Sequence, residues 1–461
     1  MFFVLLKLTP QIASEEKIGI ENPVKKKFSP QTVSPGNTSE YDINLKMDTD
    51  GKFRLKTSVE IINISEDPWE QLVFYFIPNM YTKSVSPDLE HPSTVDFHNI
   101  SINGEQAIFT LEKDTLNIKL SDKLEPNQEI RVDFSYDLTL PEEGFRFTKS
   151  NENFHLAQFY PMLATYRNHQ WNKEEYRDRG ETYHTTFSNF KLTYEIPEEY
   201  NLVSSFDHEV FPSPNKGSFE VKNVKEVFLA ILKNPTLMEK EGDIAIRVFG
   251  LKEENQELYK EIGDEASTAI KYFEDIMGPY PFKQLDVVID GIAMEYPGIV
   301  TAHTIRGGSS IHPNALKDIV IHEIAHQYFY GIINNDPYRD AWLDEGFTSF
   351  ATSLYHFSKT KESVPYESMY KQIEHLEHPV NLPLDQYESN VSSYVYGKSS
   401  TMLWRLFEKD GGREEAEKFL KNYYQFYKYK EVNTKEFVRF AQYYFNLEDI
   451  SEFETWLELN D

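Results

Sequence analysis

The sequence predicts a multidomain protein of the mixed α and β class, in which an N-terminal antiparallel β-sandwich-like domain precedes a mainly α-helical domain. Two observations carry this prediction. Hydrophobic residues alternate with polar ones in many short runs of the first half, and they recur with a helical period in the second half. A chain of 461 residues is also long enough for two or three domains.

Residues 1–39 are predicted to form an N-terminal arm. The apolar run at residues 1–6 is typical of the end of a secretory signal segment whose charged start is missing. It is too short for a membrane span, which needs about 20 apolar residues. Residues 21–40 contain three prolines and three adjacent lysines, which is typical of a linker without a core of its own. We therefore expect a secreted or cell-surface protein, with a cytoplasmic protein as the alternative.

Residues 40–237 are predicted to form the β-rich domain. Period-two alternation, with turn residues between the runs, is found at residues 41–47, 53–61, 116–120, 130–140 and 190–196. This alternation puts one face of each strand into a core and the other into solvent, as in a β-sandwich.

Residues 238–461 are predicted to form the mainly helical domain. A charged and apolar run at residues 253–277 stops at Gly278-Pro279, which is a helix stop signal. A strand is expected at residues 285–289. Further helices are expected at residues 315–330, from residue 342 onward, and at residues 399–409, 414–429 and 434–444.

The most informative motif is His322-Glu323-Ile324-Ala325-His326, on the first of these further helices. Side chains four residues apart on a helix point the same way, because one turn takes about 3.6 residues, so His322 and His326 can bind one metal ion. Glu323 then lies beside the ion, where it can act on a water molecule. Glu345 follows His326 after eighteen residues and is well placed as the third ligand. Two histidines, one carboxylate and an open position are the ligand set of a catalytic zinc.

The alternative for this motif is a chance match, with both imidazoles satisfied in the core of an amphipathic helix. The surroundings favour a metal site, because Pro313 and Asn314 mark a helix start and a second apolar-periodic stretch opens at Trp342. Two adjacent helices can bring the three ligands together. We therefore expect one zinc ion per chain, although another divalent ion could occupy the same ligands.

Four motifs then point to a family. They are Trp342-Leu343-Asp344-Glu345-Gly346-Phe347, Gly278-Pro279-Tyr280-Pro281-Phe282, Ile292-Ala293-Met294-Glu295-Tyr296 and Tyr396-Gly397-Lys398-Ser399. With the histidine motif, this set resembles the gluzincin aminopeptidases, the family of aminopeptidase N. It is less similar to the thermolysin-type endopeptidases, whose third ligand falls one residue later. The resemblance implies a thermolysin-like catalytic domain in a short form that lacks the C-terminal helical domain, and a site open on one side.

The resemblance also implies roles for the motif residues. Glu323 would be the general base that takes a proton from water and passes it to the leaving amine. Tyr396 would donate a hydrogen bond to the oxyanion, and Tyr394, two residues away, is its competitor.

Two further residues are candidates to bind the substrate amine. The resemblance assigns Glu295 to the protonated N-terminus of a peptide, which would make the protein an exopeptidase. The alternative for Glu295 is an exposed carboxylate after the strand 285–289. Gln158 is a second candidate for the same amine, and a surface-loop glutamine is an equal alternative.

The sequence departs from the family pattern at several positions. Ile292 and Tyr296 stand where the family has Gly and Asn, which puts substrate preference and strict aminopeptidase action in doubt. Thr352 stands seven residues after the third ligand, where the family often has Glu. Asp344 and Asp340 are candidates to supply a carboxylate that steadies a metal ligand instead.

Composition limits the partners of the protein. The net charge of −28 argues against nucleic acid, since phosphate binding needs clustered Lys and Arg. The absence of cysteine excludes disulfides, thiolate metal sites and cysteine nucleophiles. We expect peptide substrates and no transmembrane segment. The predicted function is that of a zinc aminopeptidase; the alternatives are a zinc endopeptidase of related fold and a non-catalytic peptide-binding surface protein, which would have no need of Glu323.

Overall fold

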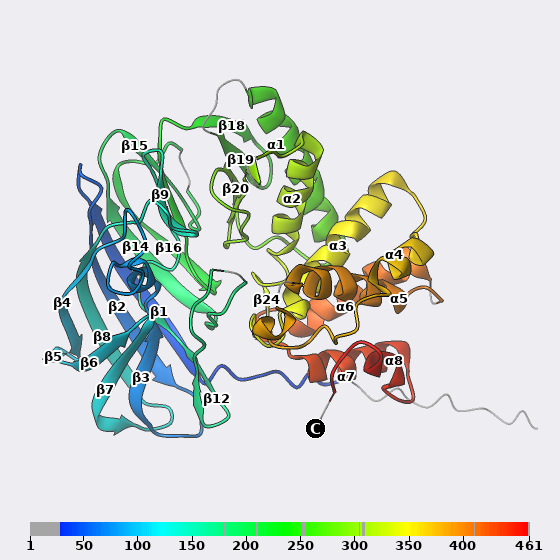
Figure 1. Cartoon of the computed structure of the whole chain (residues 1–461), viewed down its shortest axis with the longest axis horizontal. Helices are drawn as coiled ribbons and strands as arrows, with labels where there is room; N and C mark the ends of the chain where they lie inside the picture. Colours follow the sequence, from blue (N-terminus) through cyan, green and yellow to red (C-terminus); the bar gives the residue numbers. More distant parts are fainter. Residues whose placement is uncertain are drawn as a thin grey trace, which may run out of the picture.

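The computed structural model describes residues 28–178, 180–208, 211–250, 255–303, 305–306, 309–388, 390–409 and 411–459. The expected signal-like run, and the rest of the expected arm up to residue 27, lie outside the described residues. Figure 1 shows a β-rich half built from the first part of the chain beside a helical half built from the second part. The predicted fold class is therefore confirmed.

A seven-stranded sheet forms one layer of the β-rich half. Its strands in spatial order are β16 (Lys216–Val224), β14 (Ser188–Glu195), β1 (Asn37–Met47), β2 (Phe53–Asn63), β8 (Glu129–Leu138), β4 (Val95–Ile102) and β5 (Glu105–Gln106). Neighbours run antiparallel except β1 and β14, which pair in parallel with Ile43 opposite Leu192. The expected antiparallel sandwich thus has one parallel pair, between segments about 150 residues apart in the sequence.

Two four-stranded sheets cover the inner face of the large sheet. One holds β11 (Met162–Leu163), β3 (Trp69–Tyr75), β7 (Thr115–Leu124) and β6 (Ile108–Glu112); the other holds β15 (Tyr200–Ser204), β17 (Leu229–Lys233), β10 (Asn153–Leu156) and β9 (Phe147–Ser150). Alternate residues of each long strand are buried, as their period predicted. Ile43 and Leu55 of the large sheet share one core with Phe74 and Leu229 of the smaller sheets.

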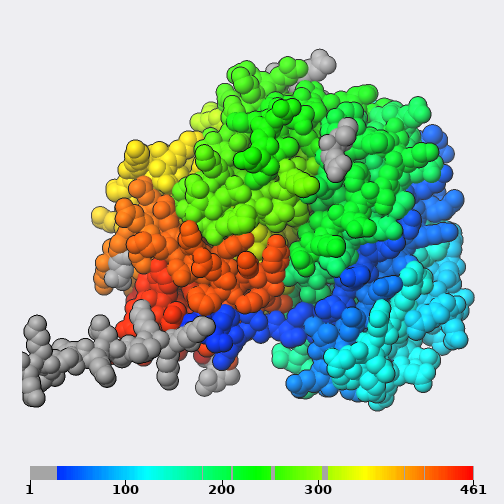
Figure 2. Space-filling model, turned by 180° about the vertical axis from the view of Figure 1, so that it is seen from behind, coloured from blue at the N-terminus to red at the C-terminus, as the bar shows by residue number. Residues whose placement is uncertain are grey.

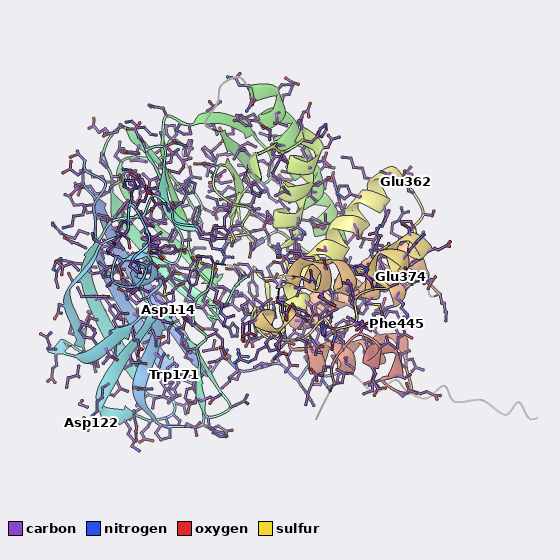
Figure 3. The ribbon with its side chains drawn as sticks, viewed as in Figure 1. Asp114, Asp122, Trp171, Glu362, Glu374 and Phe445 are labelled. Carbon is purple, nitrogen blue, oxygen red and sulfur yellow. The ribbon has the colours of Figure 1, made fainter. Side chains whose placement is uncertain are left out.

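Short elements complete the β-rich half: a 3-10 helix (Ile77–Tyr81) and a hairpin of β12 (Thr165–Arg167) and β13 (Gln170–Asn172). Figure 3 labels Asp114 and Trp171 in this half. Asp114 is fully buried and accepts a hydrogen bond from the Lys173 ammonium at 2.7 Å, so its charge is compensated. Trp171 packs against Trp69 with ring centroids 4.8 Å apart.

The helical half starts with a small sheet of its own, in the order β18 (Thr236–Lys240), β19 (Ala245–Gly250), β20 (Gln284–Ile289) and β21 (Ile299–Thr301). The chain changes sheets between β17 and β18, so residues 236 and 237 join the second half rather than the first. Helix α1 (Gln256–Ile276) packs on this sheet and ends just before Gly278-Pro279, as the stop signal predicted. β20 lies where the strand 285–289 was expected.

In the part of this half that the structure describes, six more helices of at least seven residues follow, together with several short elements. The helices are α2 (Pro313–Ala325), α3 (Trp342–Thr360), α4 (Tyr366–Ile373), α5 (Ser399–Arg405), α6 (Gly412–Tyr427) and α7 (Thr434–Phe445). The short elements are β22 (Ile305–Arg306), β23 (Ser309–Ser310), β24 (Ile333–Asn334), β25 (Lys430–Glu431), α8 (Ser451–Glu454), a 3-10 helix (Leu384–Tyr387) and a π-helix (Ser393–Lys398). None of the helices that the structure describes is long and apolar enough to cross a bilayer. Figure 3 labels Phe445, which packs on Phe419 and Phe407 in the core of this half.

The helix expected at residues 315–330 ends earlier, at Ala325. Beyond it the chain makes tight turns, in which the amide of Gly331 donates to the carbonyl of His326. Tyr330 has a φ of 112°, a strained value for a residue with a side chain, and no α-helix can continue through it. The hydrophobic residues of this segment are buried both within the helix and beyond its end, so their spacing alone does not mark where the helix stops.

The expected linker differs from the structure over its described part. Residues 28–36 form a strap that packs on the far end of the chain before β1 begins. The Phe28 ring lies 4.9 Å from that of Tyr443 and 5.2 Å from that of Phe426, and the Val33 amide donates to the carbonyl of Glu431. Figure 2 shows this blue stretch between the red and orange helices and the β-rich half. Phe28 and hydrogen bonds of the strap backbone hold it in place, and neither is recognisable in a segment whose sequence is otherwise polar and contains two prolines.

A group of charged residues, largely buried except for Arg339, also joins the two halves. We call it the interface network, and it comprises Arg167 and His184 from the β-rich half with Asp336, Arg339 and Glu431 from the helical half. The Arg167 guanidinium lies 2.7 Å from Glu431, and His184 lies 3.3 Å from the same carboxylate. Asp336 lies 3.1 Å from Arg339.

Candidate functional site

The three predicted metal ligands converge in the structure. His322 lies in α2, His326 caps its C-terminal end, and Glu345 lies in the first turn of α3. His326 Nε2 is 3.2 Å from His322 Nε2 and 3.0 Å from Glu345 Oε2, and His322 Nε2 is 3.3 Å from the same oxygen. We call these three residues the metal trio.

The spacing of the trio fits a tetrahedral zinc ion. Ligand atoms about 2.0–2.1 Å from a tetrahedral ion are about 3.3 Å apart. The three observed separations of 3.0, 3.2 and 3.3 Å are close to that value. Three ligands occupy one face of a tetrahedron and leave the fourth position open, which is the arrangement of a catalytic rather than a structural zinc site.

Asp344 steadies one of the ligands. Its carboxylate accepts a hydrogen bond from His326 Nδ1 at 2.7 Å, which leaves Nε2 for a metal ion. Of the two aspartates considered from sequence, Asp340 instead accepts from the amide of Thr434 at 3.1 Å. Thr352, at the position where the family often has Glu, donates to the Thr348 carbonyl of its own helix. The carboxylate that orients the histidine thus comes from the residue directly before the third ligand.

Charge in the trio is set by close contacts. Burial works against the charge of Glu345, but His326 and His322 overcome this effect and hold its pKa below the ordinary value. Burial also works against the charge of His326, yet Asp344 and Glu345 raise the pKa of its imidazole. A metal ion needs the imidazole without that proton, so metal binding would release a proton here.

Glu323 is buried beside the trio. Only 5% of its surface is exposed, and none of the described residues donates a hydrogen bond to its carboxylate. Burial raises the pKa of Glu323, with the negative charge of Glu345 acting in the same direction and His326 against it. A carboxyl group with a raised pKa can both take and return a proton near neutral pH.

The structure places Tyr396 at the trio and Tyr394 away from it. The Tyr396 hydroxyl donates a hydrogen bond to Glu345 Oε1, and its ring centroid lies 5.9 Å from that of His322. Tyr394 instead stacks on Tyr387 with centroids 5.1 Å apart. The two tyrosines lie in the π-helix, where their side chains take separate directions. The geometry favours Tyr396 over Tyr394 as a hydrogen-bond donor in this site.

Glu295 lies at the edge of the small sheet, beyond β21. Met294 bridges Thr301 of β21 in antiparallel fashion, so the segment before Glu295 continues the sheet outward. Glu295 is 7% exposed, which disagrees with the exposed-carboxylate alternative. Burial raises its pKa well above the ordinary value, and Glu181 contributes in the same direction. Tyr296, at the family's Asn position, is buried and stacks on Phe228 with centroids 4.1 Å apart.

Gln327, which sequence reasoning missed, ties this loop to the metal trio. It directly follows His326, and its amide donates to the carbonyls of Glu295 and Tyr296, each at 3.1 Å. Its own side-chain carbonyl accepts from the amide of Gly298 at 2.9 Å. The position of Glu295 is therefore fixed relative to α2 by one buried side chain. Its place next to the histidine motif is the only signal that could have indicated this role.

Gln158 is fully buried, so the surface-loop alternative is wrong. Its Nε2 donates to Glu226 Oε2 at 2.6 Å and to the Tyr183 hydroxyl at 3.1 Å. Tyr330, four residues after His326, donates to the same Glu226 carboxylate. These contacts connect the β-rich half to the segment that follows the metal-binding helix.

Glu181 and Glu226 are functional candidates that the sequence did not indicate. Glu181 is 8% exposed and accepts from Arg146 at 3.1 Å, while Glu226 has no exposed surface. Both lie in irregular segments of the β-rich half, outside any motif. Only the folded chain brings them near residues of the helical half.

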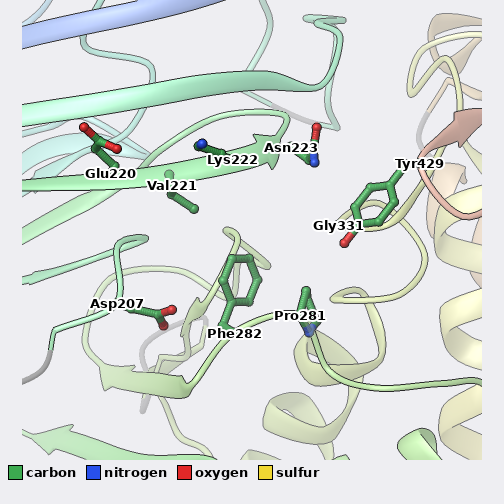
Figure 4. Close-up of a pocket in the computed structure, with 9 residues that line it drawn as sticks. All are labelled: Asp207, Glu220, Val221, Lys222, Asn223, Pro281, Phe282, Gly331 and Tyr429. Carbon is green, nitrogen blue, oxygen red and sulfur yellow. The ribbon is translucent and has the colours of Figure 1, made fainter.

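A separate cleft lies on the boundary between the halves (Figure 4). It has a volume of about 390 Å³ and is lined by Asp207, Glu220, Val221, Lys222, Asn223, Pro281, Phe282, Gly331 and Tyr429. None of the predicted site residues is among them. The metal trio and this cleft are therefore distinct places in the molecule.

Residues 263–456 match the sequence profile of the peptidase family M1 domain. Leukotriene A-4 hydrolase from Xenopus laevis is 29% identical over 202 residues, covering 39% of this chain and 32% of that protein. Aminopeptidase B from Mus musculus is 26% identical over 285 residues, covering 55% of this chain and 42% of that protein. The chain thus spans less than half the length of these two relatives.

Solved structures share the fold over nearly the whole chain. The M1 zinc metallopeptidase from Deinococcus radiodurans has a TM-score of 0.64 at 15% identity, covering 92% of this chain and 94% of that chain. A mutant of that enzyme bound to a Tyr-Ser-Ala substrate has a TM-score of 0.66, with the same identity and coverage. At this identity the likeness concerns the fold alone.

Proposed function

We propose that this chain is a zinc-dependent aminopeptidase, which removes residues from the N-terminus of peptides. The match of residues 263–456 to the peptidase family M1 domain supports this proposal. The motif-based resemblance to the gluzincin aminopeptidases is confirmed at the level of the family. One observation carries the activity: the metal trio converges at ligand spacing, with the buried carboxylate of Glu323 on the same helix.

Zinc held by the trio would polarise the scissile carbonyl and lower the pKa of a bound water molecule toward neutrality. Glu323 would take a proton from the attacking water and pass it to the departing amine. Its buried carboxylate accepts no hydrogen bond from the described residues, so its oxygens are available for that transfer. Tyr396 would donate its hydroxyl hydrogen to the developing oxyanion.

Exopeptidase action is supported by Glu295. A free peptide N-terminus carries an ammonium group near neutral pH, whereas a bond in the middle of a chain offers none. A carboxylate fixed relative to the metal-binding helix through Gln327 would favour substrates that place this cation beside it. The same contact would set the distance between the N-terminus and the bond that is cleaved.

The first test compares a short peptide with a free N-terminus and its N-acetylated form, each with and without a chelator. We expect cleavage of the free peptide only, from its N-terminal end, with loss of activity on chelation and recovery on adding zinc. Cleavage of the acetylated peptide at a similar rate would identify an endopeptidase and reject the proposal.

The second test addresses the general base. Glu323→Gln should keep zinc, measured as metal content of the purified protein, while kcat falls by about 10²- to 10⁴-fold. The exposed Glu362 (labelled in Figure 3) offers a matched control, Glu362→Gln, with kcat unchanged. Full activity of Glu323→Gln would reject this mechanism.

A further inference from the structure

Tyr330 adopts a strained backbone conformation four residues after the second metal ligand. Its φ of 112° is rare for a residue with a side chain, and the residue lies in none of the motifs singled out from the sequence. Such strain persists only where the surrounding structure holds the residue, and it collects at functional sites. The contacts around Tyr330 therefore indicate what the strain maintains.

The peptide bond between Phe329 and Tyr330 is held at both of its polar ends. Its carbonyl, from Phe329, accepts a hydrogen bond from His326 Nδ1 at 3.1 Å. Its amide, from Tyr330, donates to the carbonyl of Ile333 at 3.0 Å. Because the peptide unit is planar, the φ angle of Tyr330 sets the direction of the Phe329 carbonyl relative to the rest of Tyr330. With the side chain of Tyr330 held in place, an ordinary negative φ would turn this carbonyl away from the imidazole.

Two consecutive residues of the β-rich half hold that side chain. The Tyr330 hydroxyl donates a hydrogen bond to the carboxylate of Glu226, and the Lys225 ammonium lies 4.1 Å from the centroid of the Tyr330 ring. All three residues are buried. Glu226 is itself fixed, because it also accepts from Gln158 Nε2 at 2.6 Å and from the Tyr183 hydroxyl at 2.8 Å. We call Lys225 and Glu226 the tyrosine clamp.

The Phe329 carbonyl helps to orient a metal ligand. An imidazole that binds a metal ion through Nε2 takes its orientation from the groups that accept the N–H at Nδ1. Around His326 Nδ1, the Asp344 carboxylate at 2.7 Å and the Thr348 hydroxyl at 3.1 Å both come from α3. The Phe329 carbonyl approaches from a different segment, the turn after α2. Contacts from two segments leave the imidazole less freedom than contacts from one.

We propose that Tyr330 is a positioning residue for the metal site. The tyrosine clamp holds Tyr330 in its strained conformation, which keeps the Phe329 carbonyl at the imidazole of His326. The β-rich half thereby helps to orient a ligand that belongs to the helical half. The inference rests on the proposed function, because it takes the metal trio to bind zinc, and it adds that the contact between the two halves contributes to zinc affinity.

Replacement of Tyr330 by alanine and by glycine separates positioning from packing. Both variants lose the ring and the hydroxyl, but glycine adopts a positive φ without strain and alanine does not. Tyr330→Ala should lower zinc affinity by about 10- to 100-fold, as the loss of a group that orients a ligand does, and Tyr330→Gly should recover part of that loss. A role in packing alone predicts no such recovery, because glycine leaves the larger cavity and the more flexible chain. Competition with a fluorescent chelator measures the affinity in the full chain.

A milder variant tests the clamp without removing the ring. Tyr330→Phe loses only the hydroxyl bonded to Glu226, so it should fold, and we expect its zinc affinity to fall by about tenfold. Tyr444→Phe is the matched control: its hydroxyl is bonded to the carboxylate of Glu415 at 2.6 Å, away from the trio, and it should bind zinc as the parent does. Unfolding temperatures of the metal-free proteins show that each variant is folded.

The possible results distinguish this inference from the proposed function. Unchanged zinc affinity in Tyr330→Phe, equal affinities of the glycine and alanine variants, or an equal loss in Tyr444→Phe would overturn the role of Tyr330 while the parent chain still binds zinc and cleaves peptides. A parent chain that binds no zinc at the metal trio would reject the proposed function itself.

Discussion

Two largely buried polar regions of this molecule differ in how completely their charges are paired. In the interface network, Glu431 lies within 3.3 Å of both Arg167 and His184, and Asp336 lies 3.1 Å from Arg339. Beside the metal trio, by contrast, Gln158 Oε1 and Glu181 Oε2 are buried and the described residues offer them no donor. The carboxylate of Glu323 likewise accepts no hydrogen bond from the described residues.

This difference in pairing distinguishes residues that hold the two halves together from residues that can bind a ligand or transfer a proton. A paired buried network holds two domains in one geometry, and removing one partner leaves an uncompensated charge. An unpaired acceptor lowers stability but keeps its capacity for a ligand or a proton, which is why such groups collect at functional sites. Substitutions in the interface network should therefore lower stability, whereas substitutions at the site should lower activity or ligand affinity and largely spare stability.

The largest effect is expected from breaking the interface network. Glu431→Gln removes the carboxylate between Arg167 and His184 and should lower the free energy of unfolding by about 3–5 kcal/mol. Urea unfolding measures this change, and the exposed Glu448→Gln should stay within about 0.5 kcal/mol of the parent. An equally small change for Glu431→Gln would mean that the network does not hold the halves together.

Tyr396→Phe should affect chemistry and spare stability. Loss of the hydroxyl removes a donor to the oxyanion, so kcat should fall by about 10²- to 10³-fold. Tyr394→Phe is the matched control and should retain kcat, because its ring packs on Tyr387 away from the trio. If the two variants exchanged these outcomes, the oxyanion donor would be Tyr394.

Asp344→Asn tests a paired contact within the site itself. Without the carboxylate on His326 Nδ1, the imidazole loses its orientation and zinc affinity should fall by about 10- to 100-fold. Competition with a fluorescent chelator measures this affinity. Asp340→Asn carries the same change of charge away from the trio and should bind zinc as the parent does, since an asparagine Oδ1 can still accept from Thr434.

Acid should weaken the interface network through all of its titrating groups. Burial lowers the pKa of His184, so below about pH 6.5 the unfolded chain binds a proton that the folded chain does not, and stability falls. Burial opposes the charge of Glu431, but His184 and Arg167 overcome it and lower its pKa; the stability it adds is present above about pH 4 and lost below. Unfolding midpoints at pH 7.5, 6 and 5 should decline for the parent and decline at least as much for Glu431→Gln, because the Glu431 carboxylate raises the pKa of His184. A midpoint that rises on acidification would contradict this sign.

The smallest effect, and the one of opposite sign, is expected at Glu295. Glu295→Gln removes a buried negative charge that has no donor, so stability should stay the same or rise by up to about 1 kcal/mol. The same variant should lose affinity for free N-termini. A loss of stability comparable with that of Glu431→Gln would remove the contrast between the two regions.

How much of the site could be predicted depends on how local its residues are. His322, Glu323 and His326 lie within two helical turns, so their common direction follows from helix geometry. Glu181 and Glu226 reach the site only because two irregular segments of the β-rich half fold against the helical half, and no periodicity records that. Gln158 was indicated by resemblance, but the partners that orient its amide were not.

Prediction of the fold was limited in the same way, because the sequence pattern records local structure and not contacts between distant segments. Alternation located β1 and β2 with their buried faces, since that pattern is a property of each strand alone. The parallel pairing of β1 with β14 depends on segments far apart in the sequence, which alternation does not encode. The strap was missed because Phe28 is one aromatic residue in a stretch of prolines and lysines.

The strap has a consequence for biosynthesis. The backbone amide of Gln31 is bonded to the side chain of Glu436, a partner that leaves the ribosome 405 residues later. At about 5–20 residues per second, translation separates the two by roughly 20 to 80 seconds. During that interval the rings of Phe426 and Tyr443, which pack on Phe28, have not yet been synthesised, so the Phe28 ring of a nascent chain stays exposed until these helices emerge.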